Sequence, residues 1–222
     1  MRQLTDDLFI LAGFPPYAIN VYLIGDVLVD AGSRHAAKRI LRQLNGRTLA
    51  THVVTHAHAD HQGSSHEVCE ALRVPLWCGE LDAEAMEDGR IRSRMPSHPI
   101  NSLIGMAFPG PPHPVARRLR EGDQVAGFQV LDTPGHSAGH ISLWREPDRT
   151  LICGDVFTNI DTITGLPGLH QPKRCFTPDP AGNRESMRRL AALEPALACF
   201  GHGRPLRNPD KLKAFADRLP RD

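Results

Sequence analysis

The stretch Thr55-His56-Ala57-His58-Ala59-Asp60-His61 follows the apolar pair Val53-Val54 and comes shortly before Gly63. It places four side chains that commonly bind metals in the order His-x-His-x-Asp-His. The apolar residues before it predict a buried strand, and the small residues within it predict a tight loop. Imidazole and carboxylate ligands together suit zinc, iron or manganese. The stretch therefore predicts a metal site at the end of a strand, with a helix that begins near Ser64.

Length and charge bound the class of protein. The chain has 222 residues, enough for one large domain or two small ones, and its formal net charge is +1. No linker interrupts the predicted elements, so we expect a single domain over residues 1–222. We interpret the short basic run Arg117-Arg118-Leu119-Arg120 as solvated surface, and we expect no nucleic-acid partner because no longer basic block is present.

The sequence also indicates in which cellular compartment we expect the protein. No apolar stretch is long enough to span a membrane, and the N-terminus turns acidic early, without the apolar core of a secretory signal. The five cysteines are odd in number and have no Cys-x-x-Cys spacing, which is typical of reduced, mostly buried thiols. We therefore expect a cytoplasmic protein that has no membrane partner. The sequence does not indicate an oligomeric state.

Strands and helices alternate along most of the chain. Strands are predicted over residues 7–12, 19–30 (with a hairpin turn at Gly25-Asp26), 51–55, 75–78, 124–131, 140–145, 150–153 and 196–200. Helices are predicted over residues 34–45, 64–73, 80–88, 180–193 and 208–219. Residues 95–115 are too rich in proline for an element interior, so they form either a lid over a site or a passive surface crossing.

Histidine or aspartate recurs at four strand ends. Besides the opening motif, His136 follows the strand that ends near Leu131, Asp155 follows Leu151-Ile152-Cys153-Gly154, and His202 lies between two glycines after residue 200. A rigid sheet positions the loops at its strand ends, which is where sites are built. Glycine beside a ligand lets the backbone bend sharply. The recurrence predicts that these side chains meet in one site.

These residues together resemble the metallo-β-lactamase fold superfamily. The resemblance covers nearly the whole chain, including Asn20-Val21-Tyr22-Leu23-Ile24 and Val29-Asp30-Ala31-Gly32. The segments Thr133-Pro134-Gly135-His136-Ser137-Ala138-Gly139-His140 and Cys153-Gly154-Asp155-Val156-Phe157 are especially similar to the glyoxalase II-like branch. The resemblance implies an α/β fold, an αβ/βα sandwich in which two mixed sheets pack together with helices on the outer faces.

The resemblance also implies a partition of the ligands between two divalent metal ions. His56, His58 and His136 would hold one ion, Asp60, His61 and His202 would hold the other, and Asp155 would bridge them. Zinc is expected first, with iron or manganese as alternatives. Asp30 and Asp132 are candidates for the acceptors that orient ligand histidines, or else they cap local turns.

The remaining histidines are not expected to bind metal. His140 resembles a histidine of the family that is not a ligand. We assign no function to four further histidines or to the two in the proline-rich stretch: His35, His52, His66 and His170, and His98 and His113.

The reaction expected is hydrolysis. The nucleophile motif Gly-x-Ser-x-Gly is missing, and the family resemblance implies a metal-bound hydroxide instead. We expect a dinuclear metal-dependent hydrolase that attacks an acyl bond of a small molecule, a thioester, lactone or related ester. Asp60 is the expected catalytic residue, which orients the nucleophile and passes a proton to the leaving group. The alternatives are a mononuclear iron oxygenase like the persulfide dioxygenases, with His56, His136 and Asp155 as its ligands, and a non-catalytic metal-stabilised module.

Differences between this sequence and other branches of the superfamily reduce the number of substrate classes that we expect. A bridging Asp155 is not expected in true β-lactamases of this fold, and His58 stands where flavin-linked di-iron reductases have glutamate. The nuclease branches carry an added domain or basic arm for which we find no room. The 20 residues after His202 lack the tyrosine and lysine pattern of the glutathione-binding region of glyoxalase II, so we expect no glutathione specificity. Residues 156–178 and 14–17 are either pocket walls or ordinary surface.

Overall fold

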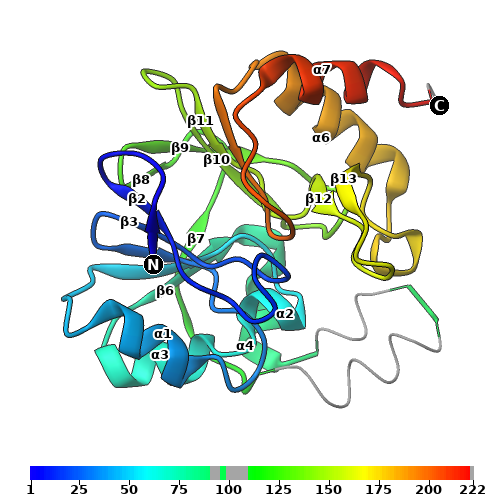
Figure 1. Ribbon diagram of the computed structural model, residues 1–222. Coiled ribbons are helices and arrows are strands. Elements are labelled where there is room, and N and C mark those ends of the chain that lie inside the picture. Colours follow the sequence, from blue (N-terminus) through cyan, green and yellow to red (C-terminus); the bar gives the residue numbers. More distant parts are fainter. Residues whose placement is uncertain (91–95, 99–109, 221–222) are drawn as a thin grey trace.

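The computed structural model describes residues 1–90, 96–98 and 110–220. Two β-sheets pack face to face, and helices cover the outer face of each sheet (Figure 1). The architecture is therefore the αβ/βα sandwich that was predicted.

The larger sheet has seven strands that lie in chain order. They are β1 (Arg2–Gln3), β2 (Leu8–Ile10), β3 (Tyr22–Ile24), β4 (Val27–Val29), β5 (Thr51–Val54), β6 (Leu76–Gly79) and β7 (Val115–Leu119). The strands β1 to β4 are antiparallel neighbours, and β4 to β7 are parallel. Because parallel neighbours finish at the same edge of a sheet, Asp30 after β4 lies close to Thr55 after β5.

The smaller sheet has five strands in the order β14-β11-β10-β9-β8. They are β8 (Gln124–Val125), β9 (Phe128–Asp132), β10 (Ile141–Arg145), β11 (Thr150–Ile152) and β14 (Leu197–Cys199). Only β11 and β14 are parallel, which brings the loops after these two strands to the same edge. A separate hairpin consists of β12 (Thr158–Ile160) and β13 (Pro167–His170).

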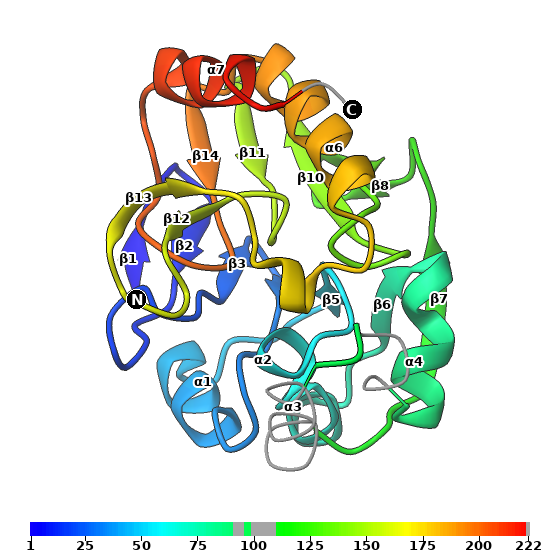
Figure 2. The same cartoon turned by 90° about the vertical axis from the view of Figure 1, so that its right-hand side faces the viewer.

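Helices flank both sheets (Figures 1 and 2). The seven-stranded sheet is covered by α1 (Ala37–Leu44), α3 (Ser65–Leu72) and α4 (Ala83–Asp88), and the five-stranded sheet by α6 (Pro180–Ala192) and α7 (Pro209–Asp217). In the described part of the chain, short helices also lie in the connections: α2 (Ala59–Gln62), η1 (Glu80–Asp82) and η3 (Arg174–Phe176).

Apolar side chains fill three layers. Tyr22, Val53 and Phe128 are buried between the two sheets, whereas Leu23 and Val54 point to the opposite side of the larger sheet, toward its helices. A third cluster lies between the smaller sheet and α6 and α7. Strand β5 is therefore buried on both faces, which explains its continuous apolar sequence and fixes the loop that follows it.

One predicted strand is a hairpin in the structure. The single strand expected over residues 124–131 is divided into β8 and β9, with Val125 paired to Phe128. The two residues between them, Ala126 and Gly127, have φ angles of 48° and 78°. Positive φ at both positions is the backbone of a two-residue hairpin turn. Because Ala126 is not a typical residue for this turn, the turn was missed in the sequence.

Other differences concern short or irregular segments. Arg117 and Arg118 are exposed, as expected, but they belong to the strand β7, where the guanidinium of Arg117 lies 5.0 Å from the centre of the Trp77 ring. Three successive exposed residues hide the alternation that would have indicated a strand. The expected loop over residues 156–178 contains the hairpin β12–β13 and η3, and α2 occupies part of the expected tight loop after His58.

The expectation for the proline-rich stretch can be compared with the structure only in part. Most of the proline-rich stretch, residues 95 and 99–109, lies outside the described residues, so the proposed lid remains a prediction. All five cysteines are free thiols; four are buried and Cys175 is half-buried. No helix in the described part of the chain is long and apolar enough to cross a membrane.

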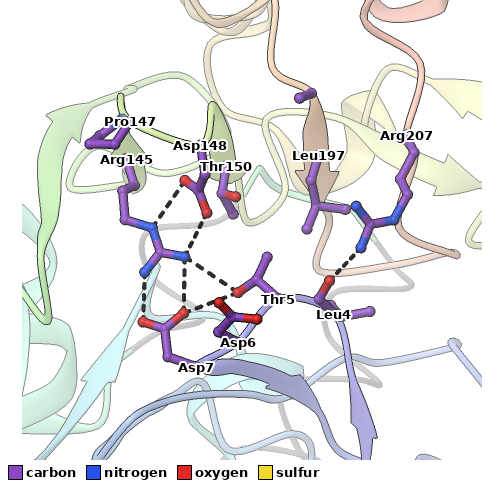
Figure 3. A pocket seen from close by; sticks show the side chains of 11 residues that line it. Leu4, Thr5, Asp6, Asp7, Arg145, Pro147, Asp148, Thr150, Leu197 and Arg207 are labelled. Carbon is purple, nitrogen blue, oxygen red and sulfur yellow. Dashed lines mark hydrogen bonds and ion pairs between the residues drawn. The ribbon is translucent and has the colours of Figure 1, made fainter.

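A cavity of about 560 Å³ opens beside the N-terminal strands, where β10 ends and β11 begins (Figure 3). The guanidinium of Arg145 in its wall lies 2.6 Å from the carboxylate of Asp7 and 2.8 Å from that of Asp148. These two carboxylates neutralise the charge of Arg145. The cavity lies at the opposite ends of β10 and β11 from His140 and Asp155, so it is separate from the histidine-bearing loops.

Candidate metal centre

The seven predicted ligands come together where the strand ends of the two sheets meet. His56 and His58 follow β5, and Asp60 and His61 belong to α2. The other three follow strands of the smaller sheet: His136 after β9, Asp155 after β11 and His202 after β14. The turns after β11 and β14 are joined directly, because the N–H of Gly201 donates to the carbonyl of Gly154 at 2.8 Å.

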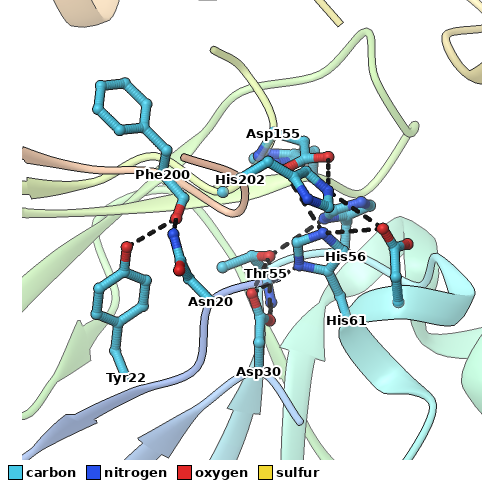
Figure 4. Close-up of polar contacts among 12 residues, drawn as sticks. Asn20, Tyr22, Asp30, Thr55, His56, His61, Asp155, Phe200 and His202 are labelled. Carbon is cyan, nitrogen blue, oxygen red and sulfur yellow. Dashed lines mark hydrogen bonds and ion pairs between the residues drawn. The ribbon is translucent and has the colours of Figure 1, made fainter. Parts of the chain in front are cut away.

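The donor atoms of the ligands form overlapping groups. In three sets the donor atoms lie within 4.8 Å of one another: His56, His58 and His136; Asp60, His61 and His202; and His56, His61 and Asp155. The carboxylate of Asp155 lies 3.0 Å from Nε2 of His202 and 3.5 Å from Nε2 of His61 (Figure 4). It also lies 3.5 Å from Nε2 of His136. Asp155 therefore touches both of the groups that the family partition separates.

Several of these donor atoms have no hydrogen-bond partner. Nε2 of His56, His61 and His136 and Oδ1 of Asp155 are buried and unpaired among the described residues. A buried polar atom without a partner destabilises the fold by roughly 1–3 kcal/mol. Imidazole nitrogens and a carboxylate oxygen that all face one small volume fit a divalent cation, which would satisfy them together.

The other ring nitrogen of each of three ligands is held by the protein. Nδ1 of His61 lies 2.8 Å from Oδ2 of Asp30 (Figure 4). Nδ1 of His136 lies 3.1 Å from the hydroxyl of Thr177, and Nδ1 of His202 donates to the carbonyl of Ala18. Such contacts fix the ring orientation and leave Nε2 free to bind a cation. Asp30 thus acts as the orienting acceptor that was expected of it.

Asp132, the second expected acceptor, does not reach the cluster. Its side chain is exposed at the end of β9, its N–H donates to Glu121, and its carbonyl accepts a hydrogen bond from Arg189. Asp132 was a candidate either for orienting a ligand histidine or for capping a local turn, and the first of these interpretations was wrong. Asp132 lies close to His136 in sequence, but its position in β9 directs it to the surface.

Asp82 is a functional candidate that the sequence did not reveal. Its buried carboxylate accepts hydrogen bonds from the N–H of Ala57 at 2.8 Å, the hydroxyl of Ser137 at 2.7 Å and the N–H of Gly139 at 2.8 Å. One carboxylate therefore joins the loop that carries His56 and His58 to the loop that carries His136. The local sequence Glu80-Leu81-Asp82 contains no motif that would have indicated this role.

His140 is held by the protein through both ring nitrogens. Nδ1 lies 2.9 Å from the hydroxyl of Thr133, and Nε2 accepts a hydrogen bond of 3.0 Å from the N–H of Asp155. Neither nitrogen is available to a cation. This agrees with the expectation that His140 is not a ligand, and it makes His140 a support for Asp155.

The electrostatics divide the cluster into two halves. Burial and the neighbouring imidazoles lower the pKa of His56 and His136. Burial also opposes protonation of His202, but the charge of Asp155 outweighs it and raises the pKa of His202 to about 10. The pKa of His61 is raised by the same carboxylate against burial. Cation binding requires both imidazoles to be neutral, so metal binding would be coupled to the release of any proton that they hold.

The remaining histidines lie apart from this cluster. His52 is buried, with Nδ1 3.2 Å from the carbonyl of Leu28 and Nε2 2.8 Å from the hydroxyl of Ser65. His35 and His98 are exposed, and His170 is half-buried in β13. His66 and His113 contact each other away from the buried cluster.

Comparisons of sequence agree on one family. The family model described as the metallo-beta-lactamase superfamily matches residues 14–202. The probable metallo-hydrolase YflN of Bacillus subtilis is 30% identical over 233 residues, covering 90% of this chain and 87% of that protein. A hydroxyacylglutathione hydrolase of Bdellovibrio bacteriovorus is 29% identical over 135 residues, which cover 59% of this chain and 43% of that protein.

Solved structures show the same architecture. A metallo-beta-lactamase family protein from Thermus thermophilus superposes with a TM-score of 0.71 at 24% identity, covering 97% of this chain and 80% of that one. The protein TTHA1623, solved in a di-iron-bound form, superposes with a TM-score of 0.62 at 29% identity. That match covers 95% of this chain and 94% of the TTHA1623 chain.

Proposed function

The chain belongs to the metallo-beta-lactamase superfamily, and we propose that it is a dinuclear metal-dependent hydrolase of a small acyl substrate, a thioester, lactone or related ester. The observation that carries this proposal is the position of Asp155. Its carboxylate lies within 3.5 Å of ligand atoms from both histidine groups. Two cations held close together repel each other, and a shared carboxylate screens that repulsion.

The ligand assignment follows the two groups. His56, His58 and His136 would hold one ion, Asp60, His61 and His202 the other, and Asp155 both. When bound, such a pair of ions supplies a hydroxide nucleophile at neutral pH and polarises the carbonyl group of the substrate. We favour zinc for this set of nitrogen and oxygen ligands. The di-iron-bound form of TTHA1623 keeps iron as the alternative.

Asp60 is the residue that we propose for proton transfer. Its side chain is 38% exposed, whereas the other six ligands are buried, so it can face both the cluster and an incoming substrate. Its Oδ2 lies 3.1 Å from Nε2 of His202 and 4.0 Å from Nε2 of His61. Burial opposes its ionisation, but the charge of His61 and the hydrogen bond with His202 keep the pKa of Asp60 low. An ionised Asp60 can accept a proton from the nucleophile and deliver it to the leaving group.

The mononuclear oxygenase is the less supported alternative. It would use His56, His136 and Asp155 as a set of three. In this structure His61 and His202 also contact Asp155, and Asp60 contacts His202. A second group of donors beside the first favours two ions over one.

Support for an acyl substrate comes from the chain's relatives and its charge. The similarity to a hydroxyacylglutathione hydrolase, a thioester-cleaving type of enzyme in the branch that the sequence resembles, covers only 43% of that protein. We therefore propose that the acyl chemistry is shared and that glutathione recognition is not. The formal net charge of +1 and the lack of a long basic block in the sequence do not favour a polyanionic phosphodiester as the substrate.

A substrate panel tests the proposal. Thioesters, lactones, β-lactams and a nitrophenyl phosphodiester are assayed with the same metal-loaded protein, and the Asp155→Ala variant serves as a control for each substrate. We expect a thioester or lactone to be cleaved fastest, and a glutathione thioester to be cleaved weakly without saturation, because remote binding energy is missing. Phosphodiester turnover above that of every acyl substrate would overturn the proposal.

A further inference from the structure

A second group of possible metal ligands lies apart from the buried cluster. His66 and Glu70 belong to α3, and His113 lies just before β7. One donor atom from each of these three residues lies within 4.8 Å of the other two. The sequence indicated no function for His66 or His113, because they are separated by 47 positions and neither belongs to a motif.

The backbone holds all three residues in place. His66 and Glu70 are four positions apart on α3, so their side chains lie on one face of the helix. Val68 and Cys69 of α3 are buried in the core and fix the position of the helix. The N–H of His113 donates to the carbonyl of Met86 in α4 at 2.9 Å. The three side chains therefore project from anchored positions.

The two imidazoles have the spacing of a chelating pair. Nδ1 of His66 lies 3.2 Å from Nδ1 of His113. Two nitrogens bound to one tetrahedral zinc ion at about 2.0–2.1 Å lie roughly 3.3 Å apart. Glu70 is exposed and contributes a carboxylate oxygen, and a water molecule would complete four ligands. Two histidines and one glutamate form a set that zinc accepts in open sites.

We propose that His66, Glu70 and His113 form a peripheral zinc site that fastens α3 to the residues leading into β7. Both histidines are half-buried, so their rings are partly shielded from competing water. A cation that binds the folded chain at this point also stabilises it against unfolding.

Zinc content measured by elemental analysis tests the site. The full-length protein is dialysed to equilibrium against increasing free zinc, together with the variants His66→Ala, His113→Ala and His35→Ala. His35 is exposed and belongs to no group of metal-binding side chains in the described part of the chain. We expect the wild type and His35→Ala to bind one equivalent more than the other two variants. This difference does not depend on how many ions the buried cluster holds.

Thermal unfolding gives a second measurement. Zinc added after the buried cluster is saturated should raise the Tm of the wild type and of His35→Ala, but not that of His113→Ala. Glu70→Gln is a second variant for the case in which His113→Ala does not fold. It changes an exposed side chain, and it should also lose the zinc-dependent increase in Tm. Equal zinc content in the wild type and in folded His113→Ala or Glu70→Gln at every zinc concentration would overturn the proposal. His66 and His113 would then be a hydrogen-bonded pair only.

Discussion

At the scale of single residues, the cluster depends most on Asp155. Its carboxylate is buried and lies close to His61 of α2 and to His136 and His202, which belong to two different loops. His140 supports it from behind through the backbone N–H of Asp155. The two residues therefore make different contributions, since the carboxylate of Asp155 lies among the proposed ligands, whereas both ring nitrogens of His140 are bound by protein groups.

We expect Asp155→Ala to lose at least one metal ion and to lower kcat/KM by about a thousandfold, because metal catalysis contributes several kcal/mol. His140→Ala should keep both ions and lose activity by about tenfold, as is usual for residues that orient ligands. Metal analysis and steady-state kinetics on both purified variants measure these effects. Equal metal loss in the two variants would refute the assignment of His140 as a residue outside the set of ligands.

Gly201 leaves room for the site. A Cβ at this position would lie 2.1 Å from Oδ1 of Asp155 and 2.5 Å from Cε1 of His61, closer than side-chain carbons approach other atoms. We expect Gly201→Ala to displace one of these two ligands and to weaken metal binding by at least about tenfold. A competition titration with a chelating dye measures the affinity. Unchanged affinity in this variant would contradict the position of the His202 turn.

At the scale of elements, strand ends and the contacts between loops build the site. The strand ends that carry the ligands were predicted from the apolar runs before them. The contacts that join these loops were not, because Asp82 and Thr177 bind groups that are far away in sequence and have no local signature. Asp132 shows the reverse: it precedes a ligand loop directly, yet its place in β9 exposes it.

Replacing Asp82 tests the contact between loops. Asp82→Ala leaves the buried N–H groups of Ala57 and Gly139 without their acceptor, which destabilises the fold by about 2–4 kcal/mol. We also expect metal affinity to fall about 10- to 100-fold, because the His58 and His136 loops lose a common support. Leu81→Ala is the matched control, since Leu81 is 67% exposed. Chemical denaturation and metal titration should separate the two variants, and equal behaviour would remove Asp82 from the site.

His52 links β5 to β4 and α3, and it makes stability depend on pH. Burial lowers its pKa from 6.5 to about 4, so the folded protein keeps it neutral while the unfolded chain protonates it. Proton binding therefore favours unfolding, and stability is lost as pH falls from about 6.5 to about 4, by up to about 3 kcal/mol. His52→Gln should flatten this part of the pH profile, whatever its stability at pH 7. Urea unfolding across the range tests this, and an unchanged slope would contradict it.

At the scale of the whole molecule, the two sheets bring together residues that lie far apart in the sequence. His56 follows a strand of the larger sheet, and His202 follows a strand of the smaller sheet. The side-chain amide of Asn20 holds the turn around His202, because it donates to the carbonyls of Phe200 and Gly203 at 2.9 and 2.7 Å. The hydroxyl of Tyr22 in β3 also donates to the carbonyl of Phe200 at 2.7 Å (Figure 4). This hydrogen bond joins the larger sheet to the turn that carries His202.

The sandwich itself was predicted from the resemblance and not from local patterns. Apolar runs indicate that strands such as β5 and β11 are buried, but they do not say which strands are neighbours. The ligand residues were easier to predict. At each of four strand ends an apolar run is followed by histidine or aspartate beside a small residue, and such a recurrence is unusual. Pairing of edge strands such as β7, and hairpins such as β12–β13, depends on contacts that one sequence does not display.

The number of metal ions bound by the buried cluster tests the central claim most directly. The count is made by elemental analysis of His113→Ala protein, in which the peripheral group adds no ion, after exposure to excess zinc and removal of the unbound metal. The seven ligands, with Asp155 between two groups, predict two equivalents per chain. A content that stays at one equivalent however much metal is supplied would contradict the dinuclear centre.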